Sequence, residues 1–592
     1  MTAETFRELS RSVVSKFLQT AIVLDDGAYL IPEGEDHSLK ASDPDPKAIA
    51  KEENDAEQGA TTARGATPNA LDARTLIDNF AVHGIVCSVL APREREDLKK
   101  ETLELAKRAD IVILDWQILD EGQKATDIIK TLLTGDSSRR LRLVVVYTAT
   151  DDLMTIRGNI TKQIEGLISV DQKNGHGIAL TNAHSRLVFL RKGSPYVAGK
   201  TVPEEQLVDQ LINEFVELTK GLLANVALAS IAAIRDETHR ILARFPNSLD
   251  APFISHRILL QTPEESEDFA TDLMVSEFQS ILRVRRVGSE YIGKEAIRLS
   301  LTEMQRDGRP FKIQSETDKA SSDITLEKLM LLVELGCSAA PEAGLPKSSL
   351  ADKLYLLFKD SVSEGVSAHH DFSRASTLFR EAHTHETEAS PKLDFGTIVQ
   401  REGQYFVCLQ PICDTVRLKA ATPFIFIPAD IAPQRTIVQI IKPGEESKDA
   451  GSDGVTQSET ASGSKEQVKA SGKDKKPNGT EGKQATEIKE PTSFDIVVKS
   501  PEGADCRLRV GSKASQTQTF RFSPNRHQAI FATQSSDQWT FHDEQGSSFR
   551  WIADIRGPYV QRLAQRVAND LSRIGLDEFE WLRRKADRNR DP

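Results

Sequence analysis

Residues 110–115 read Asp-Ile-Val-Ile-Leu-Asp, a run of four aliphatic residues that ends at an acid, Asp115. Such a short aliphatic run between polar residues is typical of a buried strand in a parallel sheet. An earlier run, Ala-Ile-Val-Leu at 21–24, ends in the same way at Asp25 and Asp26. The two stretches therefore predict two buried strands with carboxylates at their carboxyl ends.

Two later runs continue the pattern with different polar groups. Residues 143–147, Leu-Val-Val-Val-Tyr, lead to Thr148, and residues 187–191, Leu-Val-Phe-Leu-Arg, lead to Lys192. In an open α/β sheet, the groups at the carboxyl ends of the strands converge on one crevice. Any single run is more typical of an ordinary buried strand, but five matches in chain order favour one shared site of carboxylates, a hydroxyl and an ammonium.

These residue types fit a Mg²⁺-assisted site that accepts a phosphoryl group. Mg²⁺ prefers oxygen ligands, which Asp25, Asp26 and Asp115 supply. Asp115 is the candidate nucleophile, because a carboxylate can carry a phosphoryl group as an acyl phosphate. The metal and Lys192 would neutralise the equatorial phosphoryl oxygens, and the Thr148 hydroxyl could donate to one of them.

The apolar runs alternate with helical patterns as far as Thr148. Helices are expected over 4–18, 71–82 and 97–108, and a further strand over 85–90. This β-α alternation predicts a doubly wound parallel sheet.

At these residues the chain resembles the receiver domain of two-component response regulators. Asp25 and Asp26 match the acidic pair after the first strand, Asp115 the phosphoacceptor, Thr148 with Ala149 the Thr/Ser-Ala step, and Lys192 the lysine after the last strand. The resemblance implies a flavodoxin-like fold, bound Mg²⁺, and a place in a phosphorelay downstream of a histidine-kinase-like ATPase or another signalling protein.

The sequence departs from the ordinary receiver pattern in three places. Residues 31–70 insert a polar stretch, residues 151–185 enlarge the connection before Lys192, and Gly-Ser-Pro at 193–195 replaces the proline that usually follows the lysine directly. In these features the chain is most similar to the divergent, long response receiver proteins encoded in bacterial conflict and defence loci.

The rest of the chain predicts two further regions, which divides it into three. Residues 1–220 form the receiver-like domain with a disordered insertion at 31–70, and 221–392 a helical middle region. Residues 393–592 form a β-rich domain that contains a disordered insertion at 443–490 and a C-terminal helix at 558–588. Apolar spacing over 203–245 predicts one long helix or two stacked ones. The extended pattern over 396–411 predicts a hairpin that turns near Glu402-Gly403.

Composition limits the classes of function. The 592 residues carry a formal net charge of −12, and nucleic-acid-binding proteins are usually basic, so we expect no nucleic-acid partner. Five widely spread cysteines are typical of a reducing compartment with free thiols. The N-terminus has no signal-peptide core and no stretch approaches eighteen apolar residues, which predicts a soluble cytoplasmic protein without a membrane partner.

Three smaller motifs have a structural interpretation that is more common than the functional one. His369-His370 and His383-x-His385 lack a nearby thiolate, so a polar helix end is favoured over a metal site. Cys408 and Cys413 lack a second Cys/His pair, and Cys408 is expected to be a buried small hydrophobe. Asp414 and Arg417 are expected to form a structural ion pair.

Three functions remain open at this point. The chain is expected to be a signalling protein that accepts a phosphoryl group on Asp115 or docks a kinase-like partner, and not an enzyme. In a second interpretation the receiver is degenerate and serves only as a protein-interaction module in a bacterial defence system. The third is a Mg²⁺-dependent phosphohydrolase. A haloacid-dehalogenase-type site requires two acids separated by one residue, whereas the acids at 25 and 26 are adjacent.

Overall fold

The computed structural model describes most of the chain outside the two polar insertions, so the disordered segments predicted at 31–70 and 443–490 lie outside the described residues. The described residues are 5–28, 71–92, 100–118, 122–134, 140–150, 152–170, 179–182, 184–193, 201–260, 263, 265–309, 311–313, 322–345, 357, 362–382, 390–432, 494–511, 513–525, 528–535 and 538–571. They fall into two compact units: unit 1 is Met1–His256 with Ser266–Asp307, and unit 2 is Arg257–Glu265 with Gly308–Pro592.

Unit 1 is built on a seven-stranded sheet in which five strands are parallel. Its strand order is β2 (Val86–Leu90), β1 (Thr20–Leu24), β3 (Ile111–Leu114), β4 (Arg142–Thr148), β7 (Ser185–Arg191), β6 (Ala179–Thr181) and β5 (Ser169–Val170). The first five follow the flavodoxin-like order, which confirms the predicted fold class. The last two are antiparallel and extend the sheet beyond β7.

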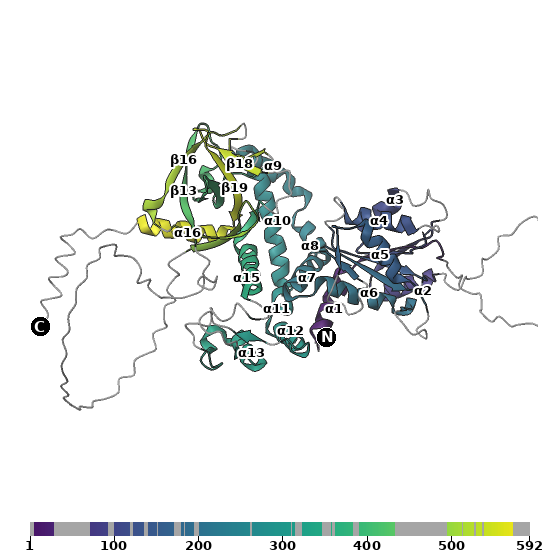
Figure 1. Ribbon diagram of the computed structural model, residues 1–592. Coiled ribbons are helices and arrows are strands. Elements are labelled where there is room, and N and C mark those ends of the chain that lie inside the picture. The colour runs from purple at the N-terminus through teal and green to yellow at the C-terminus, as the bar shows by residue number, and fades with distance from the viewer. Residues whose placement is uncertain are drawn as a thin grey trace, which may run out of the picture. The chain divides into compact units, whose positions relative to one another are not determined.

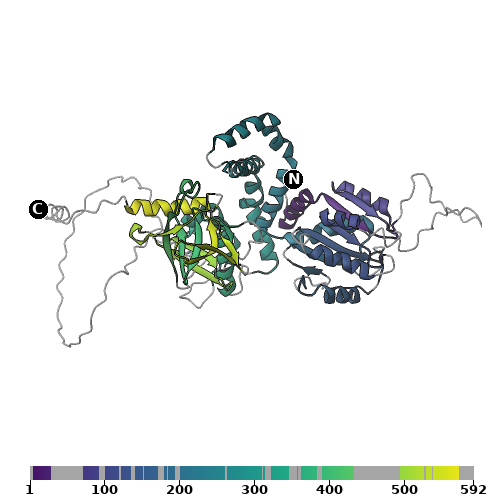
Figure 2. The ribbon, with the colours of Figure 1, turned by 90° about the horizontal axis from the view of Figure 1, so that it is seen from above.

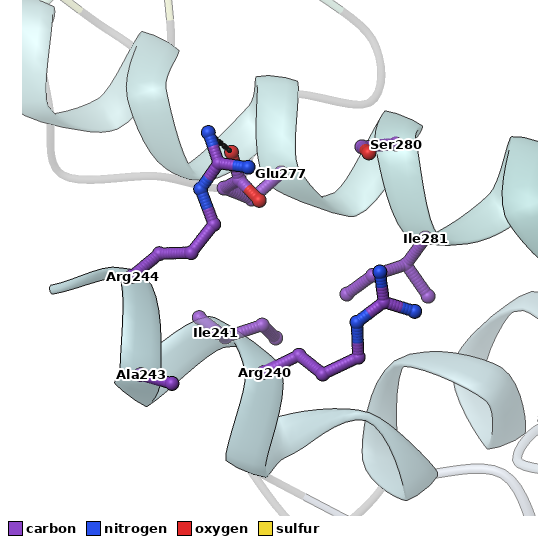
Figure 3. Close-up of a pocket in the computed structure, with 7 residues that line it drawn as sticks. All are labelled: Arg240, Ile241, Ala243, Arg244, Glu277, Ser280 and Ile281. Atoms are coloured by element: carbon purple, nitrogen blue, oxygen red, sulfur yellow. Dashed lines mark ion pairs between the residues drawn. The ribbon is translucent and has the colours of Figure 1, made fainter.

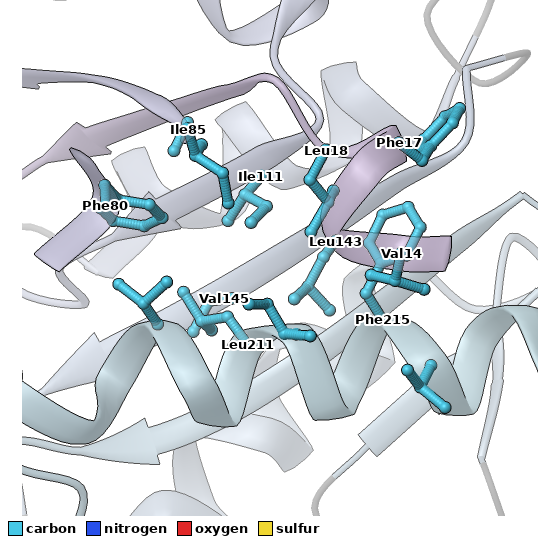
Figure 4. Packing of buried hydrophobic residues seen from close by; sticks show 14 of the residues in the cluster. Val14, Phe17, Leu18, Phe80, Ile85, Ile111, Leu143, Val145, Leu211 and Phe215 are labelled. Atoms are coloured by element: carbon cyan, nitrogen blue, oxygen red, sulfur yellow. The ribbon is translucent and has the colours of Figure 1, made fainter. Parts of the chain in front are cut away.

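Helices cover both faces of this sheet (Figures 1 and 2). One face carries α1 (Phe6–Phe17), α2 (Ala73–Val82) and α6 (Glu204–Thr219), and the other carries α3 (Lys100–Arg108), α4 (Gly122–Leu133) and α5 (Leu153–Gln163). Figure 4 shows the first interface, where Phe80, Leu211 and Phe215 pack on sheet residues such as Val145. A capping box between Thr5 and Glu8 begins α1. α1 and α6 therefore belong to the core that supports the sheet.

The region after the sheet breaks more often than the sequence predicts. Instead of one or two helices, 203–245 contains α6, α7 (Leu222–Asp236) and α8 (Thr238–Arg244). The prediction missed the break at Gly221, whose φ of 149° ends the helical path before α7. There follow η4 (Asn247–Leu249), α9 (Asp250–Leu259), α10 (Glu265–Val284), α11 (Val287–Tyr291) and α12 (Lys294–Arg306).

No single helix within the described residues is long and apolar enough to cross a membrane. Helices α6 and α7 satisfy that test only as a pair, and the pair is bent by 118°.

Unit 2 combines a few helices with a large antiparallel sheet. The sheet runs β14 (Phe494–Lys499), β15 (Asp505–Val510), β13 (Thr422–Ile431), β12 (Gln404–Cys408), β11 (Thr397–Arg401), β19 (Ser548–Ile555), β18 (Gln538–His542) and β17 (Thr533–Ser535), with β16 (Gln518–Phe522) on β13 and β10 (Leu378–Glu381) on β19. The other elements are the hairpin β8 (Lys312–Ile313) and β9 (Ser322–Asp323), then α13 (Leu326–Leu335), η5 (Gly336–Ala339), α15 (Val362–Thr377), η7 (Ile412–Asp414), η9 (Ala514–Gln516) and α16 (Gly557–Leu571). This confirms a β-rich region with a terminal helix.

The predicted hairpin is present between β11 and β12. Glu402 and Gly403 form its two-residue turn, and both have a positive φ, as a type I′ turn requires. One face of the sheet packs on α16 through Val560, Leu563 and Val567, while the other forms a second core rich in phenylalanine. The expected C-terminal helix is described only as far as Leu571. The division of the chain into regions 1–220, 221–392 and 393–592 stays a prediction.

Candidate phosphoryl-acceptor site

Three carboxylates meet at the carboxyl end of the parallel sheet. Asp25 and Asp26 follow β1 and Asp115 follows β3, and each has an oxygen within 4.8 Å of an oxygen of the others. The sheet ladder positions them, because the Asp115 N–H donates to the Leu24 carbonyl at 2.9 Å and the Asp25 N–H to the Leu90 carbonyl at 3.1 Å. Asp25 is buried, Asp115 half-buried and Asp26 exposed, so the cluster opens toward solvent on the side of Asp26.

Lys192 adds a cation to this cluster. It follows β7, where its backbone N–H donates to the Thr148 carbonyl at 2.8 Å. Its Nζ lies 2.5 Å from Oδ2 of Asp25 and 3.4 Å from Oδ1 of Asp115, and its side chain is only 9% exposed. Burial alone would lower the pKa of Lys192, but the charges of Asp25 and Asp115 outweigh burial and raise this pKa. The lysine is therefore held as an ammonium between two strand ends.

The candidate nucleophile carries an unfavourable charge in this environment. Burial raises the pKa of Asp115, the charge of Lys192 lowers it, and the neighbouring Asp25 raises it again, so that the net shift is upward. A carboxylate crowded by like charges gains stability from a nearby cation. The site is thus electrostatically suited to bind a further positive charge beside Lys192.

Thr148 lies at the end of β4 and is 1% exposed. Its Oγ1 accepts a hydrogen bond from the Thr150 N–H at 3.3 Å and lies 3.3 Å from the Thr150 hydroxyl. Both contacts are local to the loop that follows the strand. The structure thus places Thr148 on the same sheet edge as the acids, with its hydroxyl turned to its own loop.

A chain of contacts that sequence reasoning missed joins this site to α6. The Tyr147 ring centroid lies 5.9 Å from Nζ of Lys192, and the Tyr147 hydroxyl donates to the Val202 carbonyl at 2.7 Å. Val202 comes two residues before Glu204, the first residue of α6, whose carboxylate accepts from the Asp72 N–H at 3.2 Å. The sequence held two signals for these contacts: Tyr147 stands directly before Thr148, and Pro-Glu-Glu at 203–205 marks the start of a helix.

The other motifs have structural roles. His370 contacts the Asp505 carboxylate at 3.1 Å, whereas His383 and His385 lie outside the described residues. Cys408 is fully buried, as expected, and all five cysteines are free thiols. The expected pairing of Arg417 is wrong: its guanidinium binds Glu265 at 2.6 Å instead of Asp414. Both oxygens of Glu265 accept from this guanidinium, and such a bidentate ion pair is stronger than a single hydrogen bond to the nearby Asp414 would be.

Within the part of the chain that the structure describes, the carboxylates of Asp25, Asp26 and Asp115 are the one group of three or more potential ligands close enough to hold a metal ion. The donor set is all oxygen, which fits a hard cation such as Mg²⁺.

Of the comparisons with known proteins, one with family models finds a match. No curated protein and no solved structure matches the chain. The family model described as the response receiver domain matches residues 17–194, from the last residue of α1 to just beyond Lys192. The matched segment contains the whole seven-stranded sheet and every residue of the acidic site. Residues 17–194 of this chain are therefore a receiver domain, the regulatory module of response-regulator signalling.

Proposed function

We propose that this chain is a response regulator in which Asp115 accepts a phosphoryl group. The observation that carries the proposal is the convergence of three carboxylates with the Lys192 ammonium at one end of a receiver sheet. The geometry supplies a nucleophile, a set of oxygen ligands and a cation that compensates charge. These are the groups that transfer to a carboxylate needs.

In the transfer step, an Asp115 carboxylate oxygen forms a bond to the phosphorus of a phosphodonor. The bond from phosphorus to the donor's leaving group breaks, and its electron pair departs with that group. The product is an acyl phosphate on Asp115, which carries roughly two negative charges beside Asp25 and Asp26 in place of the single charge of the carboxylate. Lys192, 3.4 Å from Asp115, is placed to neutralise part of that charge.

Asp25, Asp26 and Asp115 would hold Mg²⁺, since their oxygens already lie within 4.8 Å of one another. Bound there, the ion would supply charge neutralisation at the phosphoryl oxygens. The upward shift in the pKa of Asp115 supports this assignment, because burial and the charge of Asp25 both disfavour the ionised form that a cation would favour.

Phosphorylation would be communicated through β4 and β7 to α6. A phosphoryl group on Asp115 would compete with Asp25 for Lys192 and attract the Thr148 hydroxyl away from Thr150. Tyr147 directly precedes Thr148, its ring centroid lies 5.9 Å from Nζ of Lys192, and its hydroxyl is hydrogen-bonded to Val202 just before α6. The helices after α6 and unit 2 would then be the output region, whose activity stays open.

The partner that fits this chemistry is a histidine-kinase-like ATPase or another signalling protein that carries a transferable phosphoryl group. We place the pair in a bacterial conflict or defence locus, because of the polar insertions and the Gly-Ser-Pro step after Lys192. The five free thiols support a reducing, cytoplasmic setting.

The contact of Lys192 with Asp25 favours a second candidate, a receiver that only docks a partner. Nζ lies closer to Asp25, at 2.5 Å, than to Asp115, at 3.4 Å, so the lysine already neutralises the site without any phosphoryl group. A phosphohydrolase is less favoured, because Asp25 and Asp26 are adjacent and only Asp25 is buried.

Hydrogen exchange on the full chain separates the first two candidates. Beryllofluoride with Mg²⁺ imitates the phosphorylated state and should protect residues 148–195 in the wild type, and Asp115→Ala should remove the effect. The matched control is Asp127→Ala, an exposed acid on α4, which should keep the protection. Wild-type protein without protection, but with a partner still bound by Asp115→Ala, would support the docking-only receiver.

A further inference from the structure

Three consecutive helices, α8, α9 and α10, have almost no core of their own. Within the described residues, no side chain of α8 or α9 is buried, and α10 buries only Ser266 and Ile281. These helices have 7, 10 and 20 residues. Helices shorter than about 12–15 residues are marginal in water without tertiary packing. The short α8 and α9 therefore need a cover that their own packing does not supply.

The uncovered side chains are large and apolar. On the part of this surface that belongs to unit 1, Leu242 is 72% exposed, Ile254 55% and Val275 58%. Leu249, Phe253, Phe269 and Leu273 add to them. Large apolar side chains that are exposed together on consecutive helices favour an interaction surface.

The charges on this surface are divided between two elements. α8 carries Arg240 and Arg244 and no carboxylate, whereas α10 from Ser266 to Ser280 carries four carboxylates and neither lysine nor arginine. The two arginines line a cavity of about 240 Å³ between α8 and α10, together with Glu277, Ser280 and Ile281 (Figure 3).

The arginines keep donors for a partner. Arg244 contacts Glu277 at 3.1 Å and Arg240 contacts Glu237 at 3.5 Å, but their side chains remain 65% and 49% exposed. A guanidinium has five N–H donors, so one carboxylate does not saturate it. A pair of carboxylates at i, i+4 spacing laid over the cavity, such as Asp268 and Asp272 of α10, would find these donors.

The surface that fits best is a second copy of the same three helices. We propose that the chain forms a symmetric homodimer through α8, α9 and α10. In a two-fold interface each contact occurs twice, so Asp268 and Asp272 of α10 in one copy meet the arginines of α8 in the other, and the reverse.

Sedimentation equilibrium of the full chain, between about 1 and 100 µM, tests this proposal. The wild type should be a dimer that weakens at high salt, because its charge contacts are screened. Leu242→Glu and Ile254→Glu should each raise the dimer dissociation constant at least about tenfold. Both residues are exposed, and an unchanged circular dichroism spectrum would show that the monomer still folds.

Charge exchange makes the test specific to the proposed contacts. Arg240→Glu with Arg244→Glu should weaken the dimer, as should Asp268→Lys with Asp272→Lys, and the four changes together should restore it. The control is Lys130→Glu, an exposed change on α4 that should leave dimerisation unchanged. A monomeric wild type at all concentrations, or a dimer that none of these changes weakens, would overturn the proposal. Protection of α8 and α10 from hydrogen exchange in a monomer would instead assign the cover to unit 2 of the same chain, and would also overturn it.

Discussion

Lys192 has two acidic neighbours at unequal distances, and this difference has measurable consequences. Its Nζ is 2.5 Å from Asp25 and 3.4 Å from Asp115, and all three side chains are largely withdrawn from water. Removing one partner of a buried ion pair leaves the other charge uncompensated, which costs about 3–5 kcal/mol.

We therefore expect Lys192→Met to lower the free energy of unfolding of unit 1 by about 3 kcal/mol in Mg²⁺-free buffer. Asp25→Asn in the same chain should recover part of this loss, because the uncompensated charge is gone. Urea unfolding measures both variants. Lys107→Met, which breaks an exposed pair with Glu104, should cost less than about 1 kcal/mol. Equal losses in the two lysine variants would show that the buried pair has no special role.

Trp116 provides a direct probe of the metal, because it follows Asp115 in the sequence. Titration of the wild type with Mg²⁺ should change the tryptophan fluorescence, and Asp25→Ala with Asp26→Ala should abolish that response. The control Asp127→Ala, on the exposed side of α4, should respond as the wild type does. Unaltered binding in the double variant would place the metal elsewhere.

At the scale of elements, the start of α6 contains a carboxylate that is held partly neutral. Burial raises the pKa of Glu204 from 4.5 to about 7, although the backbone N–H of Asp72 acts in the opposite direction. The folded state thus holds its proton more tightly than the unfolded chain. The stability from this group is fully present below pH 4.5 and is lost as the pH rises through about 7.

Glu204→Gln should therefore remove a pH dependence of stability. Its unfolding free energy should match that of the wild type near pH 4.5 and exceed it above pH 7 by on the order of 1 kcal/mol. The amide can still accept from Asp72. Chemical unfolding at both pH values measures the difference, with the exposed Glu205→Gln as the matched control. A constant difference across the pH range would contradict the role given to Glu204.

The sequence predicted the parts of the receiver in which each strand is a continuous apolar run with a polar end. Those ends, at Asp25, Asp115, Thr148 and Lys192, do lie on one sheet edge. The hairpin of β5 and β6 escaped prediction, because strands of two and three residues are too short to show an alternating pattern. The pairing of Lys192 with Asp25 also escaped, since a distance between strand ends depends on side-chain conformations that spacing does not specify.

At the scale of the whole molecule, the matched receiver segment is smaller than the unit that must fold. It ends at residue 194, whereas Leu207, Leu211 and Phe215 of α6 are fully buried in the core on which the sheet rests. Leu228 and Ala229 of α7 belong to the same core. Cutting the chain before α6 would expose the apolar face that these residues cover.

We expect a fragment of residues 1–307 to unfold cooperatively with native circular dichroism, and a fragment of residues 1–194 to lack a cooperative transition. A fragment of residues 1–220, the receiver-like domain expected from the sequence, retains α6 but loses α7 and should have intermediate stability. Thermal unfolding of the three fragments is the measurement. Equal midpoints would show that the helices after residue 194 are dispensable for the receiver.

Mass spectrometry of the full chain can detect phosphorylation of Asp115 itself. After incubation with acetyl phosphate and Mg²⁺, reduction by borohydride would convert an acyl phosphate at Asp115 to homoserine, which a peptide map locates. We expect this mark at Asp115 in the wild type and in Asp127→Asn, and its loss in Asp115→Asn and without Mg²⁺. Wild-type protein without the mark, or with the mark at another acid, would show that Asp115 is not the phosphoryl acceptor.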